Sequence, residues 1–283
     1  MKDANTCHEN NMLYQRISTA LPLAALVVWI IFFQPSSVFF YFVLFIVLIA
    51  AYEWAKLSGV QNILLKSVYA IFMVITVWLI QKYAQNYHLW IIYVAVLWWF
   101  GVTFYLKNAK PKAASSDLNV NNLLAAFIVL PAATLAMRDI HALDQGAYWL
   151  FFAISLVWMA DNGAYFSGKK FGKHKLAPDI SPGKTKEGLV GAVVATSLYT
   201  LVVSYYSGLN TEKSALLILL SIILTFISVS GDLYFSFLKR EAGVKDSGNI
   251  LPGHGGILDR IDSILAAMPV FIIGYNWLIV TGA

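Results

Sequence analysis

Residues 214–262 read SALLILLSIILTFISVSGDLYFSFLKREAGVKDSGNILPGHGGILDRID. An apolar run, 214–236, leads into a block, 236–262, that holds four basic residues, four carboxylates, one histidine and five glycines. A run of this length is enough for a helix to cross about 30 Å of hydrocarbon. Charge concentrated at a membrane edge is costly and therefore points to a function. The stretch predicts a membrane helix that delivers a polar site to one face of the bilayer.

The composition of the whole chain supports a membrane protein. Of the 283 residues, 59% are hydrophobic and only 12% are charged, and the mean hydropathy is +0.68. Soluble domains have roughly a quarter of their residues charged. The single cysteine, Cys7, excludes an intrachain disulfide framework and a cysteine-ligated zinc site. The polar tail before the first apolar run would fit a signal peptide, but the cleavage signal at Ser36 and Ser37 is weak and many more spans follow, which predicts a retained first helix.

Nine apolar runs predict an all-α integral membrane protein with about nine transmembrane helices. The first two are joined by a tight turn at 34–37, so a hairpin that crosses only in part is an alternative for them. The predicted spans are 18–33, 38–57, 63–81, 88–106, 121–137, 147–166, 188–206, 214–236 and 261–280.

The basic residues predict which way the helices face. With a cytoplasmic N-terminus, 17 of the 20 lysines and arginines fall on the inner side, and only Lys82, Arg138 and Lys213 fall outside. This asymmetry follows the positive-inside rule. The two long polar loops, 167–187 and 237–260, then lie on the cytoplasmic face. The chain shows no internal repeat, which weakens a transporter interpretation.

Two polar positions interrupt or end the apolar runs upstream. Glu53 lies near the inner end of 38–57, and two interpretations stay open: an interfacial carboxylate paired with Lys56, or a group near a substrate headgroup. Asp161 and Asn162 end the sixth run, where an aspartate needs a cation, a partner or water. The glycine- and lysine-rich segment 168–175 that follows predicts a flexible basic loop, which would either bind anionic lipid or belong to a site.

Residues 181–188, SPGKTKEG, partly match a phosphate-binding loop. The P-loop spacing fails because Pro178 stands where a glycine is required, and no strand is predicted before it. Lys184 and Thr185 nevertheless precede an apolar helical run. A helix start, an ammonium and a hydroxyl are together suited to phosphate.

The block 236–262 carries the densest chemistry. On one helix Asp232, Ser236, Lys239 and Arg240 are spaced i, i+4, i+7 and i+8, so they share a face. The alternative for such a run is a solvated charged face.

The next helix brings two more carboxylates, because Asp259 and Asp262 are spaced i, i+3. Carboxylates from two helices would bind a hard cation such as Mg²⁺, while the basic groups hold phosphates. Capping of the helix by Asp259 is the alternative. A zinc site at His254 is disfavoured, because the five histidines form no HxxxH pair.

The same block resembles the signature of the phosphatidate cytidylyltransferases, the CDP-diacylglycerol synthases, without a mismatch. The segments AYEWAKL, 161–165 and LAPDISPGKTKEG resemble the same family, and the resemblance is specific from about 160 to 263. The matching residues are Ser236, Leu238, Lys239, Arg240, Lys245, Asp246, Gly248, Leu251, Pro252, His254, Gly255, Gly256, Ile257, Asp259, Arg260, Ile261 and Asp262.

The resemblance implies transfer of CMP from CTP to phosphatidic acid, with Mg²⁺ as cofactor. Implied metal ligands are Asp232 and Asp259, with Asp246 and Asp262 as further candidates. Implied catalytic residues are Lys239, Arg240, Lys245, Arg260, Ser236 and His254. Implied substrate-binding residues are Asp161, Asn162, Lys175, Ser181, Lys184, Thr185, Glu187, Gly255 and Gly256.

The resemblance also implies a setting for the reaction. We expect residues 1–120 to form an N-terminal group of about four helices and 121–283 to form the catalytic region. The expected partners are CTP, phosphatidic acid and the lipid bilayer, in the inner membrane of a bacterium, with no nucleic acid; a homodimer stays open. The alternatives are another CTP-dependent lipid enzyme, such as a polyprenol kinase or an archaeol-type cytidylyltransferase, and a transporter.

Overall fold

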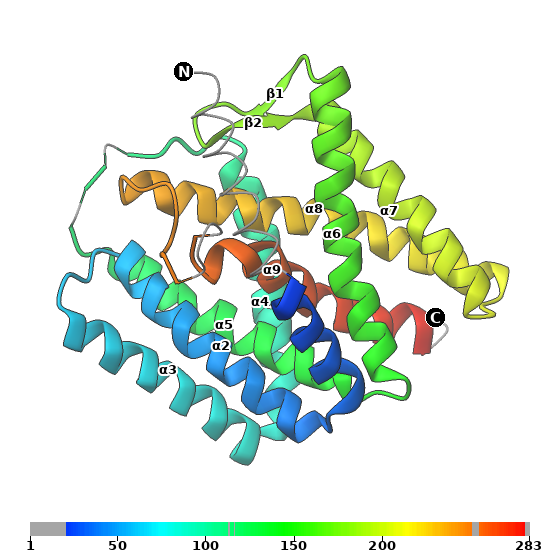
Figure 1. Ribbon diagram of the computed structural model, residues 1–283, viewed down its shortest axis with the longest axis horizontal. Coiled ribbons are helices and arrows are strands. Elements are labelled where there is room, and N and C mark those ends of the chain that lie inside the picture. The colour runs from blue at the N-terminus through cyan, green and yellow to red at the C-terminus, as the bar shows by residue number, and fades with distance from the viewer. Residues whose placement is uncertain (1–20, 113, 116, 251–254, 281–283) are drawn as a thin grey trace, which may run out of the picture.

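Helices fill most of the chain in the computed structural model (Figure 1), which describes residues 21–112, 114–115, 117–250 and 255–280. An apolar helix, Leu21–Phe33, comes first. It is followed by α2 (Ser36–Leu57), α3 (Ile63–Tyr83), η1 (Gln85–Tyr87), α4 (His88–Leu106), α5 (Val120–His141), α6 (Gly146–Phe171), α7 (Lys186–Tyr206), α8 (Thr211–Glu241) and α9 (Leu258–Gly274), which runs on as the π-helical segment η2 (Tyr275–Val280). Each of the nine predicted apolar runs is therefore helical where it is described.

Side-chain caps begin four of these helices. Asn62, Asn119 and Asn210 accept hydrogen bonds from the first free backbone N–H groups of α3, α5 and α8. Thr185 does the same for α7 through the N–H of Gly188. A cap of this kind satisfies a donor that has no partner inside the helix.

The surface of the bundle is apolar, as membrane insertion requires. Six helices of the described chain are long and apolar enough to span a membrane, namely α2, α3, η1 with α4, α5, α7 and α8. On α3, the side chains of Ile71, Phe72 and Ile75 are about half exposed. An apolar surface of this extent belongs in lipid. The protein is an all-α integral membrane protein, and a total of nine spans stays a prediction.

The segment predicted as a flexible loop, 167–187, has regular structure instead. Helix α6 continues to Phe171, and the chain then forms an antiparallel hairpin of β1 (Lys175–Ala177) and β2 (Ser181–Thr185). In Figure 1 this hairpin lies at one end of α6 and α7. A strand does therefore lead into α7, contrary to the sequence prediction, and the hairpin is the one exception to the helical fold among the described residues.

Helix α6 extends past its glycines because α7 packs closely against them. A Cβ added at Gly163 would collide with Ala195 and with the backbone of Gly191, and one added at Gly191 would collide with Ser167. Small residues let two helix backbones approach closely in membranes. The contact with α7 therefore offsets the weak helix propensity of glycine, and Asp161 lies inside α6, ten residues before its end at Phe171.

The segments predicted to be cytoplasmic meet at one end of the bundle. The N–H of Asn119 donates to the carbonyl of Ser58 at 2.9 Å, and the N–H of Ser115 donates to the carbonyl of Glu241 at 3.0 Å. Helix α8 runs to Glu241, so the predicted loop 237–260 is shorter and covers 242–257. We call the described residues of 53–62, 107–122, 161–188 and 229–262 the site end.

The segments predicted to face outward meet at the opposite end. His141 bonds Ser36 Oγ through Nδ1 and the carbonyl of Ile31 through Nε2, each at 2.9 Å. Asp139 Oδ2 lies 3.5 Å from His88 Nδ1. We call residues 31–36, 81–88 and 138–146 the far end. The loops thus alternate between two ends as predicted, while the membrane side that each end faces stays a prediction.

Candidate active site

Three carboxylates from three helices interact at the site end, with Asp232 at their centre. Asp232 on α8 interacts electrostatically with Asp161 on α6 and with Asp262 on α9, and both interactions are repulsive. Lys184 opposes this charge: its Nζ lies 2.7 Å from Asp232 Oδ2. On the same face of α8, Ser236 Oγ donates to Asp232 Oδ1 at 3.3 Å. The predicted shared face of α8 is present.

The hairpin β1–β2 holds Lys184 in this position. Ile180, between the two strands, is 1% exposed and so anchors the hairpin in the protein. Arg240 on α8 donates from Nε to the carbonyl of Ile180 at 3.3 Å. Thr185, next to Lys184, is buried as the N-cap of α7, so its hydroxyl serves the helix. The ammonium of Lys184 is thus the group of this segment that meets Asp232.

A second ion pair lies deeper in the site end. Lys239 Nζ contacts Asp259 Oδ1 at 2.7 Å, with side chains 13% and 6% exposed. The other oxygen of Asp259 accepts from the backbone N–H of Ser247 at 2.8 Å and of Gly256 at 3.0 Å. Burial raises the pKa of Asp259, but these donors outweigh it and hold the pKa below its ordinary value. Protein donors thus engage both oxygens of Asp259.

Glu53 lies beside this network, and the interpretation of it as an interfacial carboxylate paired with Lys56 was wrong. It is 2% exposed, and Lys56 reaches toward the carbonyl of Ser247, at 3.4 Å, instead of pairing with it. Glu53 Oε1 accepts from the N–H of Ile257 at 3.1 Å, and Oε2 accepts from the N–H of Leu258 at 2.9 Å. Ser247 Oγ lies 2.9 Å from the same Oε2. The carboxylate is bound to the first N–H groups of α9.

Glycines leave room for these contacts. A Cβ at Gly256 would collide with Ser247 Oγ and Glu53, and one at Gly248 would collide with Glu53. Gly255 has a φ of 82°, a conformation that side chains disfavour. At Gly255 and Gly256, which the resemblance implies bind substrate, the backbone therefore comes close to the carboxylates of Asp259 and Glu53.

The remaining predicted residues are spread over the same end. Asn162 donates to the carbonyl of Trp158 on its own helix, and Glu187 accepts from the backbone of Lys173 and His174 and from the His174 ring at 2.6 Å. The Glu187 contacts tie the start of α7 to the segment that leads into β1. Lys175, Lys245, Asp246 and Arg260 are exposed, and Ser181 is half-buried. His254 lies outside the described residues.

The donors around Asp232 fit a magnesium ion that also binds substrate. Within the described ranges, no three His, Cys, Asp or Glu side chains are close enough together to form a metal site by themselves. Magnesium, however, usually takes one or two carboxylates and fills its other positions with water and substrate phosphates. A cation beside Asp232 would relieve its repulsion with Asp161 and Asp262. Asp259 fits less well, because its oxygens are already engaged.

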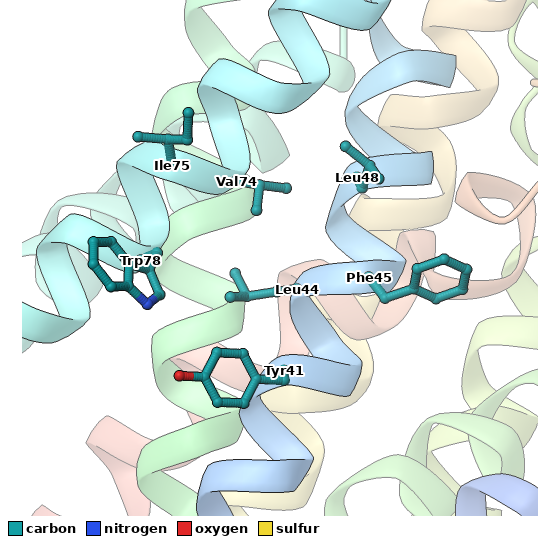
Figure 2. A pocket seen from close by; sticks show the side chains of 7 residues that line it. All are labelled: Tyr41, Leu44, Phe45, Leu48, Val74, Ile75 and Trp78. Atoms are coloured by element: carbon teal, nitrogen blue, oxygen red, sulfur yellow. The ribbon is translucent and has the colours of Figure 1, made fainter.

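A groove elsewhere in the molecule carries no such chemistry. Figure 2 shows this space of about 310 Å³ between α2 and α3. Its surface is almost entirely carbon, and it belongs to the lipid-facing side of the bundle. Its lining residues are Tyr41, Leu44, Phe45, Leu48, Val74, Ile75 and Trp78.

Comparison with known proteins identifies the family. The model of the cytidylyltransferase family matches residues 14–278. The chain belongs to this family. It is similar to a phosphatidate cytidylyltransferase of Haemophilus influenzae, 36% identical over 92% of this chain and 97% of the relative. A phosphatidate cytidylyltransferase of Pseudomonas aeruginosa is 38% identical over 92% and 96%. One of Bacillus subtilis is 46% identical over 50% of this chain and 55% of the relative.

Two residues of the site end were missed as members of the site. Glu53 had been considered as a partner of Lys56 or as a group near a substrate headgroup, but not as a partner of α9, and Ser247 had not been singled out. The usable signal for Glu53 was an acidic side chain among buried apolar neighbours, because a buried charge requires partners. Ser247 gave no signal beyond its place in a glycine-rich loop.

Proposed function

We propose that this cytidylyltransferase family member transfers CMP from CTP to phosphatidic acid, giving CDP-diacylglycerol and pyrophosphate. The similarity to two phosphatidate cytidylyltransferases, over more than nine-tenths of each chain, carries this conclusion. The site supports it, since it combines lysines suited to phosphates with carboxylates suited to a divalent cation. In the reaction a phosphate oxygen of phosphatidic acid bonds to the α-phosphorus of CTP. The bond from that phosphorus to the pyrophosphate oxygen breaks.

The chain's own groups position charge in this reaction. Lys184 and Lys239 each lie in an ion pair with an aspartate, and we assign both ammonium groups to the phosphates of CTP. Phosphoryl transfer depends mainly on alignment and neutralisation of charge. Arg240, Lys245 and Arg260 are assigned to outer phosphate contacts, and Ser236 orients Asp232.

We assign a magnesium ion to Asp232, with Asp161 and Asp262 beside it. When bound, it would neutralise negative charge on the phosphates. Asp232 would hold it, while Asp161 and Asp262 would lie nearby on two other helices, so its position would depend on how α6, α8 and α9 pack. The other ligands that the resemblance implies are kept as alternatives: Asp259, which was implied together with Asp232 and lies in its pair with Lys239, and Asp246 in an exposed loop.

We place the site end on the cytoplasmic side, in a bacterial inner membrane. The excess of lysine and arginine at this end supports the assignment. CTP would then reach the site from the cytosol, while phosphatidic acid stays in the bilayer. A homodimer remains compatible with this arrangement.

A turnover assay on the purified protein tests the function. The protein in lipid–detergent micelles receives CTP labelled on the α-phosphate and, in separate reactions, phosphatidic acid or a polyprenol, with and without Mg²⁺. The expected result is labelled CDP-diacylglycerol and equimolar pyrophosphate with phosphatidic acid alone. A parallel reaction with CTP labelled on the γ-phosphate tests the kinase alternative. Label in polyprenyl phosphate would then assign the protein to the polyprenol kinases. No product with either lipid would overturn the enzyme assignment.

A further inference from the structure

Glu53 lies on α2 and connects that helix to the start of α9. Its bonds to Ile257 and Leu258 cross 204 and 205 residues of chain. A carboxylate that is 2% exposed is costly unless donors surround it. Two backbone N–H groups and the hydroxyl of Ser247 supply those donors, and the positive end of α9 favours the charge. The contact is therefore specific for an acceptor with two oxygens.

The clamp formed by Glu53, Ser247, Ile257 and Leu258 is continuous with the site. Ser247 Oγ lies 2.9 Å from Glu53 and 3.0 Å from Asp259 Oδ2. Asp259 is the partner of Lys239, and Asp262 follows one turn later on α9. Any shift at the start of α9 would therefore move both groups relative to Asp232 on α8.

Steric contacts make this clamp tight. A Cβ at Gly256 or at Gly248 has no room beside the Glu53 carboxylate. The loop thus approaches Glu53 as closely as backbone can. Surface side chains that only contact lipid or water have no such enclosure.

We propose that Glu53 is a positioning residue for the reaction: it fixes the start of α9, and through Ser247 and Asp259 it fixes Lys239 and Asp262 against Asp232. Glu53 touches no substrate in this role. The proposal rests on the proposed function, because the aligned groups are those assigned to the phosphates and the cation.

The test compares Glu53→Gln with wild type in turnover, hydrogen exchange and thermal stability. Glutamine keeps the shape but places an NH₂ group against an N–H donor. We expect kcat to fall by about 10- to 100-fold, the cost of misalignment by about 1 Å. KM for CTP should change less than about threefold, since no substrate contact is lost. The backbone amides of Ile257 and Leu258 should exchange their hydrogens faster. The amides of the other helices should keep their protection against exchange, and the melting midpoint of the protein should not change.

Two further variants guard against misfolding. Ser247→Ala removes one donor and should lower kcat by a smaller factor, about 3- to 10-fold, with the same local exchange. Gly256→Ala displaces the carboxylate itself. In the double variant Glu53→Gln with Gly256→Ala, kcat should fall no further than in the more damaging single variant, because both changes break the same contact.

Asp139→Asn is the matched control, because its carboxylate pairs with Arg138 at the far end. It lies about 25 Å along α5 from the residues beside Glu53, and it should leave both kcat and exchange at 257–258 unchanged.

Several results would overturn the role. An unchanged kcat or an unchanged exchange rate at 257–258 in Glu53→Gln would contradict the proposal. If Glu53→Gln does not fold, an unchanged kcat or exchange rate in Ser247→Ala would contradict it. Losses that multiply in the double variant would show independent effects. Faster exchange throughout the bundle would assign Glu53 to general stability. If wild type has no turnover, the function fails, whereas the exchange experiment still tests the clamp.

Discussion

The two ends of the bundle use polar residues in different ways. At the far end, His141 is held between Ser36 and Ile31, and Asp139 lies between Arg138 and His88, although His88 Nε2 has no hydrogen-bond partner among the described residues. At the site end, Asp232 repels both Asp161 and Asp262, and Lys184 and Lys239 partly offset this negative charge. At the far end one carboxylate meets two basic side chains, whereas at the site end carboxylates also face one another, an arrangement suited to a bound cation. This difference supports the proposal that the reaction takes place at the site end.

Replacing one aspartate by asparagine at each end should give the largest difference in turnover between the two ends. Asp232→Asn should lower turnover of CTP and phosphatidic acid by about 10²- to 10³-fold, because the group at the centre of the charged site is lost. Asp139→Asn should stay within about twofold of wild type. Initial rates at saturating substrate, normalised to monodisperse protein, measure both. Equal losses in the two variants would remove the functional distinction between the ends.

Replacing one basic side chain at each end should lower the free energy of unfolding by different amounts. Lys239→Met leaves Asp259, 6% exposed, without its partner and should cost about 3 kcal/mol. Arg138→Met affects a pair that is 32% and 21% exposed and should cost at most about 1 kcal/mol. Unfolding in a denaturing detergent, followed by circular dichroism, gives both values. A larger loss for Arg138→Met would contradict the burial argument.

Acid should weaken the site end through Asp259. Its pKa in the folded protein is below the ordinary value of about 3.9. A depressed pKa contributes stability that is fully present above the ordinary value and is lost as the pH falls through the folded value. The gap in melting midpoint between wild type and Asp259→Asn should stay constant from about pH 7 to 5 and narrow below about pH 4. A gap that widens on acidification would show the opposite sign of shift.

The smallest effect is expected for a single bond at the far end. Ser36→Ala removes the hydroxyl 2.9 Å from His141 Nδ1 and should cost about 1 kcal/mol. Turnover should equal that of wild type, because the bond joins only the start of α2 to the end of α5. A melting scan and the turnover assay on one preparation test both parts. A selective loss of turnover would extend the functional region to the far end.

The positions of the helices could be predicted, because an apolar run long enough to span a membrane has few other structures available. The shared face of Asp232 and Ser236 on α8 could also be predicted, since helix periodicity fixes it. The assignment of site roles to individual residues stays a prediction.

The errors came from contacts between distant segments. Gly168 and the lysines after it indicated a flexible loop, but the packing of α7 against α6 keeps this segment helical as far as Phe171. The partners of Glu53 are 194 to 205 residues away, and no local pattern encodes such a contact. Local periodicity describes an element, whereas tertiary packing decides where it ends and what it touches.

The clamp at Glu53 also sets an order of events during synthesis. The carboxylate leaves the ribosome 204 residues before the first N–H group that it will bind. At about 5–20 residues per second, the delay is about 10–40 s. During this time α2 is already made, and its acidic group has no α9 to receive it, so it must remain near water or borrow a temporary partner. The active enzyme can therefore form only after α9 has been made and has packed against α2.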